Sequence, residues 1–464
     1  MNISKSKFVE SKSCPKIFWL NIHHIEEKEA ETESQIAQMD FGSSVGELAR
    51  AYFGKYELVD FPYEEYSKKL SKTQELLKKN TKIIAEATFL TNGICCSVDI
   101  LRKVGDGYDL IEVKSVNTPK DYHYDDIAFQ YHVLRNAGLN IKRAYLMHFN
   151  KKYERWGDLD LQQLFILNDI TDRVIKMNPD IINRFQVLQQ LSTQKNEPEI
   201  EVGSHCEKYV YGGQCPYYTY CHRNFEVVEE LEVEEFENID KSEIADFLQN
   251  FRYPIYFLDF ETYMTPIPQY NGLKPWGQTP FQYSFHILHE DGALEHKEYL
   301  GYPDSDPRIG LIKQLCTDIP KDACVVAYNM TFEKTRLKEL ASFAKKTDGF
   351  KNRAGKLNKI RNSMLDLMIP FRKKHYETDA MEGSYSIKLV LPALFPNDPD
   401  LDYNQLEGIK NGTDAMNTFP ALTNENYSTD EIEAKREQLL AYCKLDTLAM
   451  VKIFQKLKSS VSVK

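Results

Sequence analysis

The chain lacks a long apolar run. None of its 464 residues belongs to an uninterrupted apolar stretch approaching the roughly 20 residues that a membrane-spanning helix needs. The first residues, Met1 to Lys7, also lack the apolar core of a secretory signal peptide. We therefore expect a soluble, cytoplasmic protein that does not associate with membranes.

Positive charge is also in short supply. The formal net charge is −11, which counts against a general surface for polyanions. It does not count against a nuclease, because acids that bind metal ions are neutralised by them and basic residues gather locally, as at 351–361 and 372–375. Internal repeats and long low-complexity segments are absent too. With 42% hydrophobic residues, the chain can fill the cores of two or three domains.

A short buried strand carries the most informative acids. Residues 253–263 begin with an apolar and aromatic run, typical of a fully buried strand, and continue with Asp259 and Glu261. Residues two apart on a strand point to the same face, so the two carboxylates should lie side by side. Such a pair is costly unless a cation lies between the charges, and oxygen ligands suit Mg²⁺ or Mn²⁺. The alternative is one solvated acid and one helix or turn cap.

Two later segments carry further candidate residues. The first, residues 323–337, predicts a buried strand, a break at Asn329 and a helix that carries Glu333. The second is the strongly helix-periodic stretch near the C-terminus. In it Tyr442 and Asp446 are four residues apart, which places them on one face of the helix.

Together these three segments resemble the DEDDy 3′–5′ exonucleases of the ribonuclease H-like fold, over roughly residues 253–458. Asp-x-Glu corresponds to their first motif, the stretch from Asn329 to Glu333 to the second, and Tyr-x-x-x-Asp to the third. Glu333 stands where those enzymes usually carry Asp, which is one methylene shorter. The resemblance implies two divalent cations that clamp the attacking and leaving oxygens of a phosphodiester, with Tyr442 orienting the attacking water. The acids of this site would be Asp259, Glu261, Glu333 and Asp446.

A second set of polar residues lies on a predicted strand meander earlier in the chain. Two strand-like runs meet at an Asp-Gly pair, which is a strong hairpin signal. Asp99 lies on the strand before this turn, and Glu112 and Lys114 lie two apart on the strand after it, facing the same way. A predicted helix follows and carries Gln130. For the Glu-x-Lys pair, a surface salt bridge is the simplest alternative.

Asp…Glu-x-Lys on adjacent strands resembles the PD-(D/E)XK nucleases. The resemblance implies that Asp99 and Glu112 hold one or two Mg²⁺ or Mn²⁺ ions. Lys114 would then activate water or stabilise the charge that develops on the phosphorane.

The helix after this hairpin resembles the DNA-contacting helix of the RecB-like branch, whose motif is Gln-x-x-x-Tyr. Position 134 is Leu here, and Gln130 with Tyr131 stand in for the motif. The resemblance also implies a role for Glu47, which lies on a predicted helix over 42–53. This branch often places another metal-site residue on that helix.

Nine cysteines in a chain expected to be cytoplasmic favour metal-binding or core roles over disulfides. One N-terminal cysteine and a later trio resemble the iron–sulfur staple of RecB-like nucleases, although the first gap of the trio is longer than in those families. The resemblance implies a [4Fe–4S] cluster; four thiolates also suit zinc, with His205 or His222 as a further ligand. Cys443 lies in an apolar context and is predicted to pack in the core. The four candidate ligands are Cys14, Cys206, Cys215 and Cys221.

The order of these motifs predicts an α/β protein with two domains. We expect a PD-(D/E)XK restriction-endonuclease-like domain over residues 1–225, an acidic linker and lead-in helix over 226–250, and a ribonuclease H-like mixed-sheet domain over 251–464. The whole order resembles an uncharacterised bacterial family that fuses a RecB-like half to a DEDDy half.

These resemblances imply a metal-dependent nuclease that hydrolyses DNA in repair, recombination or defence. The C-terminal domain would supply 3′–5′ exonuclease activity and the N-terminal domain a second nuclease site. The alternatives are an RNA-processing 3′–5′ exonuclease and a non-catalytic nucleic-acid-binding scaffold, because both nucleic acids are phosphodiesters. In the C-terminal domain Asp366 is a candidate supporting acid, and Ser386 and Lys388 are candidate substrate contacts.

Overall fold

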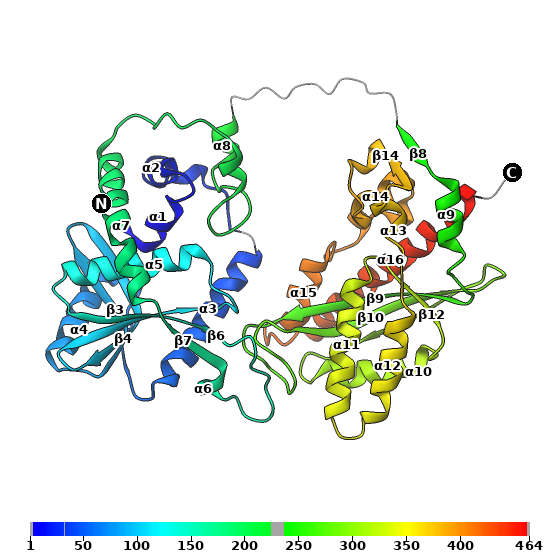
Figure 1. Ribbon diagram of the computed structural model, residues 1–464, viewed down its shortest axis with the longest axis horizontal. Helices are drawn as coiled ribbons and strands as arrows, with labels where there is room; N and C mark the ends of the chain where they lie inside the picture. The colour runs from blue at the N-terminus through cyan, green and yellow to red at the C-terminus, as the bar shows by residue number, and fades with distance from the viewer. Residues whose placement is uncertain (1–2, 32, 224–235, 462–464) are drawn as a thin grey trace. The chain divides into compact units, whose positions relative to one another are not determined.

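Residues 3–31, 33–223 and 236–461 are described by the structure, a computed structural model (Figure 1), with the side chains of 33–40 and 63 excepted. The predicted α/β class is confirmed. The chain divides into an N-terminal unit, Met1–Glu229 with Thr265–Trp276, and a C-terminal unit, Glu230–Met264 with Gly277–Lys464. The predicted acidic linker lies outside the described residues over 226–235.

A mixed seven-stranded sheet forms the centre of the N-terminal unit. Its strands are β1 Ile3–Ser4, β2 Glu57–Leu58, β3 Ile83–Thr91, β4 Ile94–Val104, β5 Gly107–Lys114, β6 Ile141–Phe149 and β7 Phe165–Asp169. The order is β2-β3-β4-β5-β6-β7, with β1 pairing in parallel to β4. Strands β3, β4 and β5 form the predicted antiparallel meander, and β6 runs parallel to β5.

Helices of the N-terminal unit build its core on this sheet. They are α1 Lys5–Glu10, α2 Pro15–His23, α3 Glu33–Tyr52, α4 Tyr66–Lys78, α5 Asp121–Asn136, α6 Leu161–Leu164, α7 Thr171–Thr193 and α8 Tyr218–His222. Phe8 of α1, Phe129 of α5 and Phe185 of α7 pack ring to ring, with centroids 4.8–5.2 Å apart. This contact ties the short N-terminal helix to the helices that cover the meander. Short 3₁₀ turns lie at Ile25–Glu27, Tyr63–Glu65 and Ser204–Glu207.

The C-terminal unit contains a five-stranded sheet. Its strands are β9 Ile255–Met264, β10 Gln278–Leu288, β11 Leu294–Leu300, β12 Cys324–Ala327 and β13 Leu365–Asp366, in the order β11-β10-β9-β12-β13. The first three pair antiparallel, whereas β12 and β13 continue the sheet in parallel from β9. β10 hydrogen-bonds along the length of β9.

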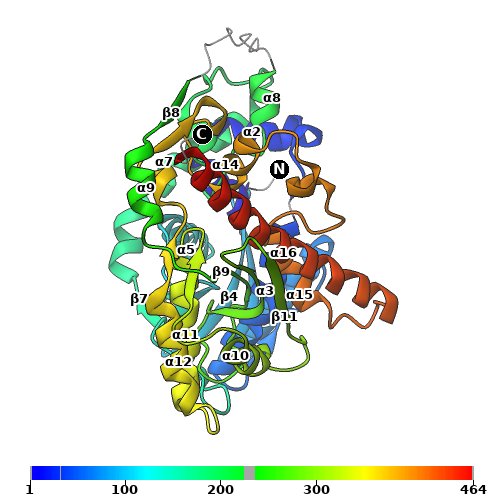
Figure 2. The ribbon, with the colours of Figure 1, turned by 90° about the vertical axis from the view of Figure 1, so that its right-hand side faces the viewer.

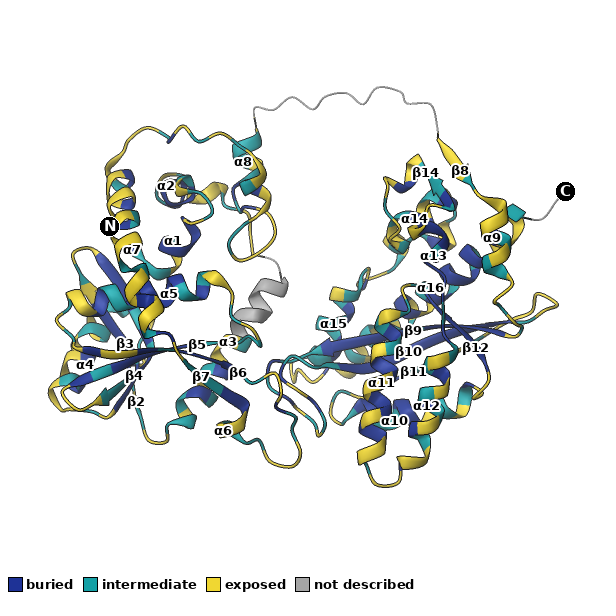
Figure 3. Ribbon diagram, viewed as in Figure 1, coloured by how far each residue is buried: buried dark blue, intermediate teal, exposed yellow. Residues whose placement is uncertain are grey.

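Helices cover both faces of this sheet, and β9, β10 and β12 are largely buried, whereas the edge strand β11 is mostly exposed (Figure 3). The helices are α9 Lys241–Leu248, α10 Pro307–Asp318, α11 Thr331–Lys346, α12 Lys351–Ser363, α13 Ile369–Arg372, α14 Ile387–Leu394, α15 Gly412–Ala421 and α16 Thr429–Val461. Residues of β9 alternate: Tyr256 and Leu258 pack with α10, α11 and α12, whereas Ile255 and Phe257 pack with α9, α14 and α16. The long helix α16, red in Figure 2, thus lies on the face to which Asp259 and Glu261 also belong.

Sequence periodicity did not predict the short strand β8 of this unit. β8 Glu237–Ile239, within the predicted lead-in, pairs antiparallel with β14 Tyr376–Thr378. Short 3₁₀ turns lie at Asp379–Met381, Pro399–Leu401 and Tyr403–Gln405. Across the described residues, every helix is too short or too polar to cross a membrane.

Candidate metal centres

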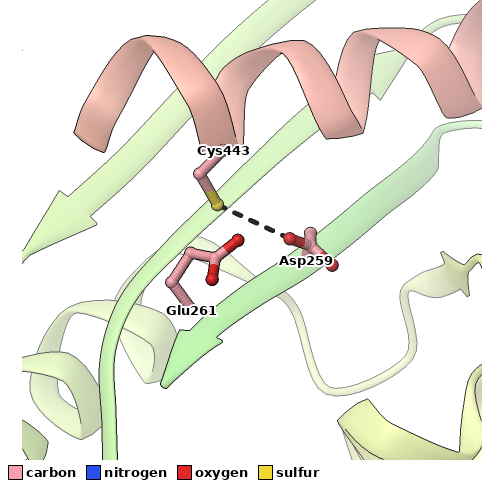
Figure 4. A group of neighbouring side chains, drawn as sticks. All are labelled: Asp259, Glu261 and Cys443. Atoms are coloured by element: carbon pink, nitrogen blue, oxygen red, sulfur yellow. Dashed lines mark hydrogen bonds between the residues drawn. The ribbon is translucent and has the colours of Figure 1, made fainter. Parts of the chain in front are cut away.

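Asp259 and Glu261 lie side by side on β9, beneath α16 (Figure 4). One carboxylate oxygen of each and the Sγ atom of Cys443 all lie within 4.8 Å of one another. Cys443 is fully buried, as the prediction of a core role requires, yet its thiol also donates a hydrogen bond to Asp259 Oδ2 at 3.7 Å. Within the described part of the chain this is the one group of three such ligand atoms at that spacing.

Glu333 reaches the same region through a strand–turn–helix connection. β12 ends at Ala327, Asn329 adopts a left-handed conformation with φ of 63°, and α11 begins two residues later. The Glu333 side chain is only 3% exposed, and its Oε2 atom has no hydrogen-bond partner. A buried carboxylate oxygen without a partner is costly. The unpartnered Glu333 Oε2 atom is therefore a candidate ligand for a bound cation.

Asp366, the predicted supporting acid, holds this turn. Its Oδ1 atom accepts hydrogen bonds from the backbone N–H groups of Asn329 at 3.0 Å and Met368 at 3.1 Å. The carboxylate therefore stabilises the left-handed turn that aims α11.

Two tyrosines lie beside Asp446 of α16. Tyr442, one turn earlier on the same helix face, lowers the pKa of the Asp446 carboxyl. Tyr403, which comes from a 3₁₀ turn far away in sequence, donates a hydrogen bond to Asp446 Oδ1 at 2.5 Å. Sequence analysis missed Tyr403 because it belongs to no motif and its segment has no regular period.

Burial raises the pKa values of the four acids of this centre, which we call the Asp259 site, and neighbouring acids add to the effect at three of them. Burial, and then the charge of Asp446, holds the pKa of Asp259 well above its usual range. Burial raises the pKa of Asp446 to about 6. For Glu261 and Glu333, burial and then Asp259 raise the pKa values well above the usual range. Lys388 is the basic side chain that opposes this effect at Glu261.

The Asp259 site opens into a groove. Lys388 of α14 lines it, together with Tyr442 and Asp446 of α16. Ser386, the other predicted substrate contact, is exposed at the cap of α14, outside the residues that line the groove. The groove therefore presents one cation and several carboxylates to an entering molecule.

Glu112 is the centre of the second candidate, which we call the Asp99 site. Its Oε1 atom lies 2.8 Å from Lys114 Nζ and 2.7 Å from Lys5 Nζ. Its Oε2 atom accepts a hydrogen bond from Gln130 Nε2 at 2.6 Å. Lys114 also forms an ion pair with Asp126 of α5. Both oxygens of this carboxylate, which is 1% exposed, are thus engaged.

The position of Gln130 differs from that of the DNA-contacting Gln of the RecB-like motif. It is fully buried and bound to Glu112, so it positions that carboxylate and is not on a surface that DNA could contact. The neighbouring Tyr131 packs against the core of the N-terminal unit. The predicted Glu47 is exposed and lines the same groove as Asp99.

Asp99 lies across from an acid that sequence analysis missed. Asp99 Oδ2 accepts a hydrogen bond from the backbone N–H of Val113 at 2.7 Å. On the neighbouring strand the pairs Ala85–Ile100 and Ala87–Val98 bracket Glu86, which therefore faces Asp99. Glu86 has φ of 57°, a left-handed backbone conformation that is rare for residues other than glycine. A lone Glu inside an apolar strand was the available sequence signal.

Burial and neighbouring charges shift the pKa values of Asp99 and Glu112 in opposite directions. Burial, then Glu112, raises the pKa of Asp99 to about 7. Burial disfavours the ionised form of Glu112 as well, but the charges of Lys114 and Lys5 outweigh it and hold the pKa of Glu112 well below its usual range. Glu112 is therefore an anion at neutral pH, and Asp99 is poised to release its proton to a cation.

The four predicted cysteine ligands line one enclosed pocket, which we call the cysteine cage. Cys14 caps α2, and a backbone hydrogen bond of 2.7 Å from Cys215 to Cys206 closes the loop between those two residues. Burial raises the pKa values of Cys14 and Cys221, and it raises that of Cys215 to about 11. His205, the alternative ligand, lies 3.6 Å from the Cys206 sulfur through Nε2.

The cage is wide. A tetrahedral zinc ion with Zn–S bonds of about 2.3 Å holds its sulfurs roughly 3.8 Å apart. Among the described residues, no three cysteine or histidine ligand atoms here lie within 4.8 Å of one another. The ligand atoms are therefore not arranged as in a closed tetrahedral zinc site.

A family model described as a domain of unknown function (DUF2779) matches residues 256–386. The match begins in β9 and ends just before α14, so it includes Asp259, Glu261 and Glu333 but not Tyr442 or Asp446. None of the curated proteins matches the chain.

Proposed function

We propose that this protein is a metal-dependent nuclease that hydrolyses the phosphodiester bonds of DNA. In this proposal the Asp259 site is a 3′–5′ exonuclease centre and the Asp99 site is a second nuclease centre. The observation that carries the proposal is the Asp259 site itself, a cluster of four buried acids in which Lys388 faces Glu261 and Asp446 and Arg336 faces Glu333. Buried acids of like charge are retained where they bind cations.

The residues of the Asp259 site fit hard divalent cations. Asp259 and Glu261 offer adjacent oxygens, and the unpartnered Oε2 of Glu333 is a further ligand atom. Mg²⁺ or Mn²⁺ prefers such oxygen ligands, and when bound it would polarise the phosphate and lower the pKa of a water molecule. Glu333, with its extra methylene, would reach the second cation.

The other side chains of the site supply orientation. Burial, then the charges of Asp446 and Glu261, raises the pKa of Tyr442, so its hydroxyl stays protonated and can hold the attacking water. Tyr403 fixes the Asp446 carboxylate by a hydrogen bond. Lys388 lies on the groove wall, where it would bind a backbone phosphate of the entering strand.

For the Asp99 site, the proposal assigns the metal to Asp99 and Glu112. Lys114 then stabilises the charge that develops on the phosphorus centre. For the cysteine cage, we propose a [4Fe–4S] cluster bound by its four thiols. A reducing, cytoplasmic compartment belongs to the same proposal, because these cysteines are free thiols.

An RNA-processing exonuclease is the second candidate, since the same carboxylates would cleave either backbone. The third is a nucleic-acid-binding scaffold without catalysis. The unpartnered buried oxygen of Glu333 argues against the scaffold, because binding alone gives no reason to bury it.

The decisive experiment uses Lys114→Ala protein, in which cleavage depends on the Asp259 site. Labelled single- and double-stranded DNA and RNA are incubated with Mg²⁺ or Mn²⁺, and product lengths report polarity. Asp259→Asn should reduce 3′–5′ degradation by about 100-fold or more, equivalent to roughly 3 kcal/mol in the barrier, and should weaken Mn²⁺ binding. Tyr442→Phe should slow cleavage without loss of Mn²⁺ binding.

The matched control is Asp304→Asn, the same change at an exposed acid of the same unit, which should leave the rate unchanged. Absence of cleavage of all four substrates, or full activity of the Asp259→Asn variant, would overturn the proposal. Preference for RNA over DNA would select the second candidate.

A further inference from the structure

Lys5 is a basic residue of the Asp99 site that belongs to none of the motifs described above. It is the first residue of α1, and its Nζ atom lies 2.7 Å from Glu112 Oε1. The backbone before it is fixed, because Ile3 and Ser4 pair with Ile94 and Cys95 of β4. A rigid strand and helix start therefore deliver this side chain to the site from more than a hundred residues away in sequence.

The acids of the Asp99 site surround Lys5. Glu112 is its direct partner, and Asp126 and Asp99 are the next charges that it faces. The Lys5 ammonium is paired with Glu112, and its side chain is still 26% exposed toward the groove that Asp99 and Glu86 line.

Lys5 and Lys114 compete for one atom. Both ammonium groups contact Oε1 of Glu112, at 2.7 and 2.8 Å. Lys114 has a second partner in Asp126, which keeps it in place without Glu112. A divalent cation on Asp99 and Glu112 would repel the neighbouring ammonium that is less firmly held, and that group is Lys5.

The charges around the site leave a partner for the displaced ammonium. Five acids and three bases belong to the metal-free site, so the acids are in excess by two; these residues are Glu47, Glu86, Asp99, Glu112, Asp126, Lys5, Arg50 and Lys114. A divalent cation on Asp99 and Glu112 offsets that excess. An ammonium released from Glu112 can then pair with a phosphate oxygen of the substrate.

We propose that Lys5 is a second catalytic lysine of the Asp99 site, which holds Glu112 in the metal-free protein and contacts a phosphate oxygen of the substrate once metal is bound. This inference rests on the proposed nuclease function of the N-terminal unit. It predicts two effects of opposite sign when Lys5 is removed. Turnover falls because a cation is lost from the transition state, whereas metal binds more tightly because a competitor for Glu112 is lost.

The experiment compares Lys5→Met, Lys5→Arg and Lys7→Met in full-length Asp259→Asn protein, in which the other site is disabled. Lys7→Met is the matched control, because it makes the same change of charge on the same helix. Single-turnover cleavage of DNA and Mn²⁺ binding are measured at about pH 8.5, above the pKa of Asp99 near 7, so that the carboxylates are ionised.

Lys5→Met should lower the single-turnover rate about 100-fold, the effect of losing one charge-stabilising donor. Its Mn²⁺ dissociation constant should fall about tenfold, since a repelling charge several ångströms away is removed. Lys5→Arg should retain more of the rate, and Lys7→Met should match the parent in both measurements.

A purely structural role for Lys5 predicts the opposite metal effect. Loss of a salt bridge alone would disorder Glu112, so Mn²⁺ would bind more weakly while the rate falls, and that result overturns the inference. An unchanged rate overturns it as well. Lys114→Ala in the same background distinguishes failure of the proposed function from failure of the inference about Lys5. If Lys114→Ala does not reduce cleavage, the proposed nuclease function of this unit is wrong. If Lys114→Ala reduces cleavage but Lys5→Met does not, only the inference about Lys5 is wrong.

Discussion

Glu112 and Glu261 have opposite electrostatic environments although both are buried carboxylates in candidate metal sites. Glu112 is neutralised by two lysines and a glutamine amide. Glu261 has acids as its nearest charges, with Lys388 as the opposing cation. Metal should therefore replace existing partners at the Asp99 site, whereas at the Asp259 site it supplies a charge that the protein lacks.

This difference predicts how stability depends on pH. Burial raises the pKa of Asp446 from its ordinary value of 3.8 to about 6, and Asp259, Glu261 and Glu333 are raised further. An acid whose pKa is higher in the folded state stabilises the fold below its unfolded pKa and loses that contribution as pH rises through the folded pKa. Metal-free protein should therefore lose stability from the Asp259 site as pH rises from about 4 through 6 and above.

Thermal unfolding in chelator and in Mn²⁺ at a series of pH values would test this expectation. The difference between the two melting temperatures should widen as pH rises, because the cation binds only the ionised carboxylates. Asp259→Asn should narrow the difference at neutral pH, since one of the repelling charges is gone. A difference that stays constant with pH would contradict the assigned site.

Helix α1 connects the Asp99 site to the cysteine cage. Its first residue is Lys5, and its last, Glu10, is buried and accepts hydrogen bonds from Tyr209 at 2.9 Å and Asn21 at 2.8 Å. Tyr209 lies in the loop between Cys206 and Cys215. The cage loop thus holds one end of the helix whose other end contacts Glu112.

This connection predicts that the cage supports cleavage at the Asp99 site. Anaerobically purified protein should be brown, with about four irons per chain. Cys14→Ser should lose the colour and reduce Lys114-dependent cleavage by about tenfold or more, while cleavage that depends on Asp259 changes by less than about twofold, as expected for independent sites. Iron content, absorbance and the two activities are the measurements.

Cys316→Ser is the matched control, because Cys316 is a partly buried free thiol of the C-terminal unit. It should retain iron and both activities. Colourless protein with one zinc per chain would contradict the cluster and leave a zinc cage.

The molecule contains two units, each with its own sheet, core and candidate site. The residues of the Asp99 site and the cysteine cage all belong to the N-terminal unit, and those of the Asp259 site all belong to the C-terminal unit. Each site should therefore work without side chains from the other.

Independence predicts additive effects of substitution. Lys114→Ala and Asp259→Asn should each remove one pattern of products from 5′-labelled DNA, and the double variant should remove both. In each single variant the rate of the remaining pattern should match that of the parent to within about twofold, as for distant sites. If either single substitution abolished all degradation, the two sites would have to act in one sequence of steps.

Local periodicity predicted the elements that carry the acids. The alternation along β9 placed Asp259 and Glu261 on one face, the break at Asn329 separated β12 from α11, and the four-residue spacing placed Tyr442 and Asp446 on one face of α16. These predictions are confirmed because each depends on geometry within one strand or helix. The predicted hairpin between β4 and β5 is confirmed for the same reason.

The sequence by itself therefore determined the α/β class and the local geometry of the motif residues. Only the tertiary structure decided which residues from distant segments join them: Lys5 and Glu86 at the Asp99 site, Tyr403 at Asp446, and the pairing of β8 with β14. The reason is physical, because an ion pair or a hydrogen bond between separate strands and helices leaves no period in the chain. Such contacts exist only once the sheets have set the strands and helices side by side.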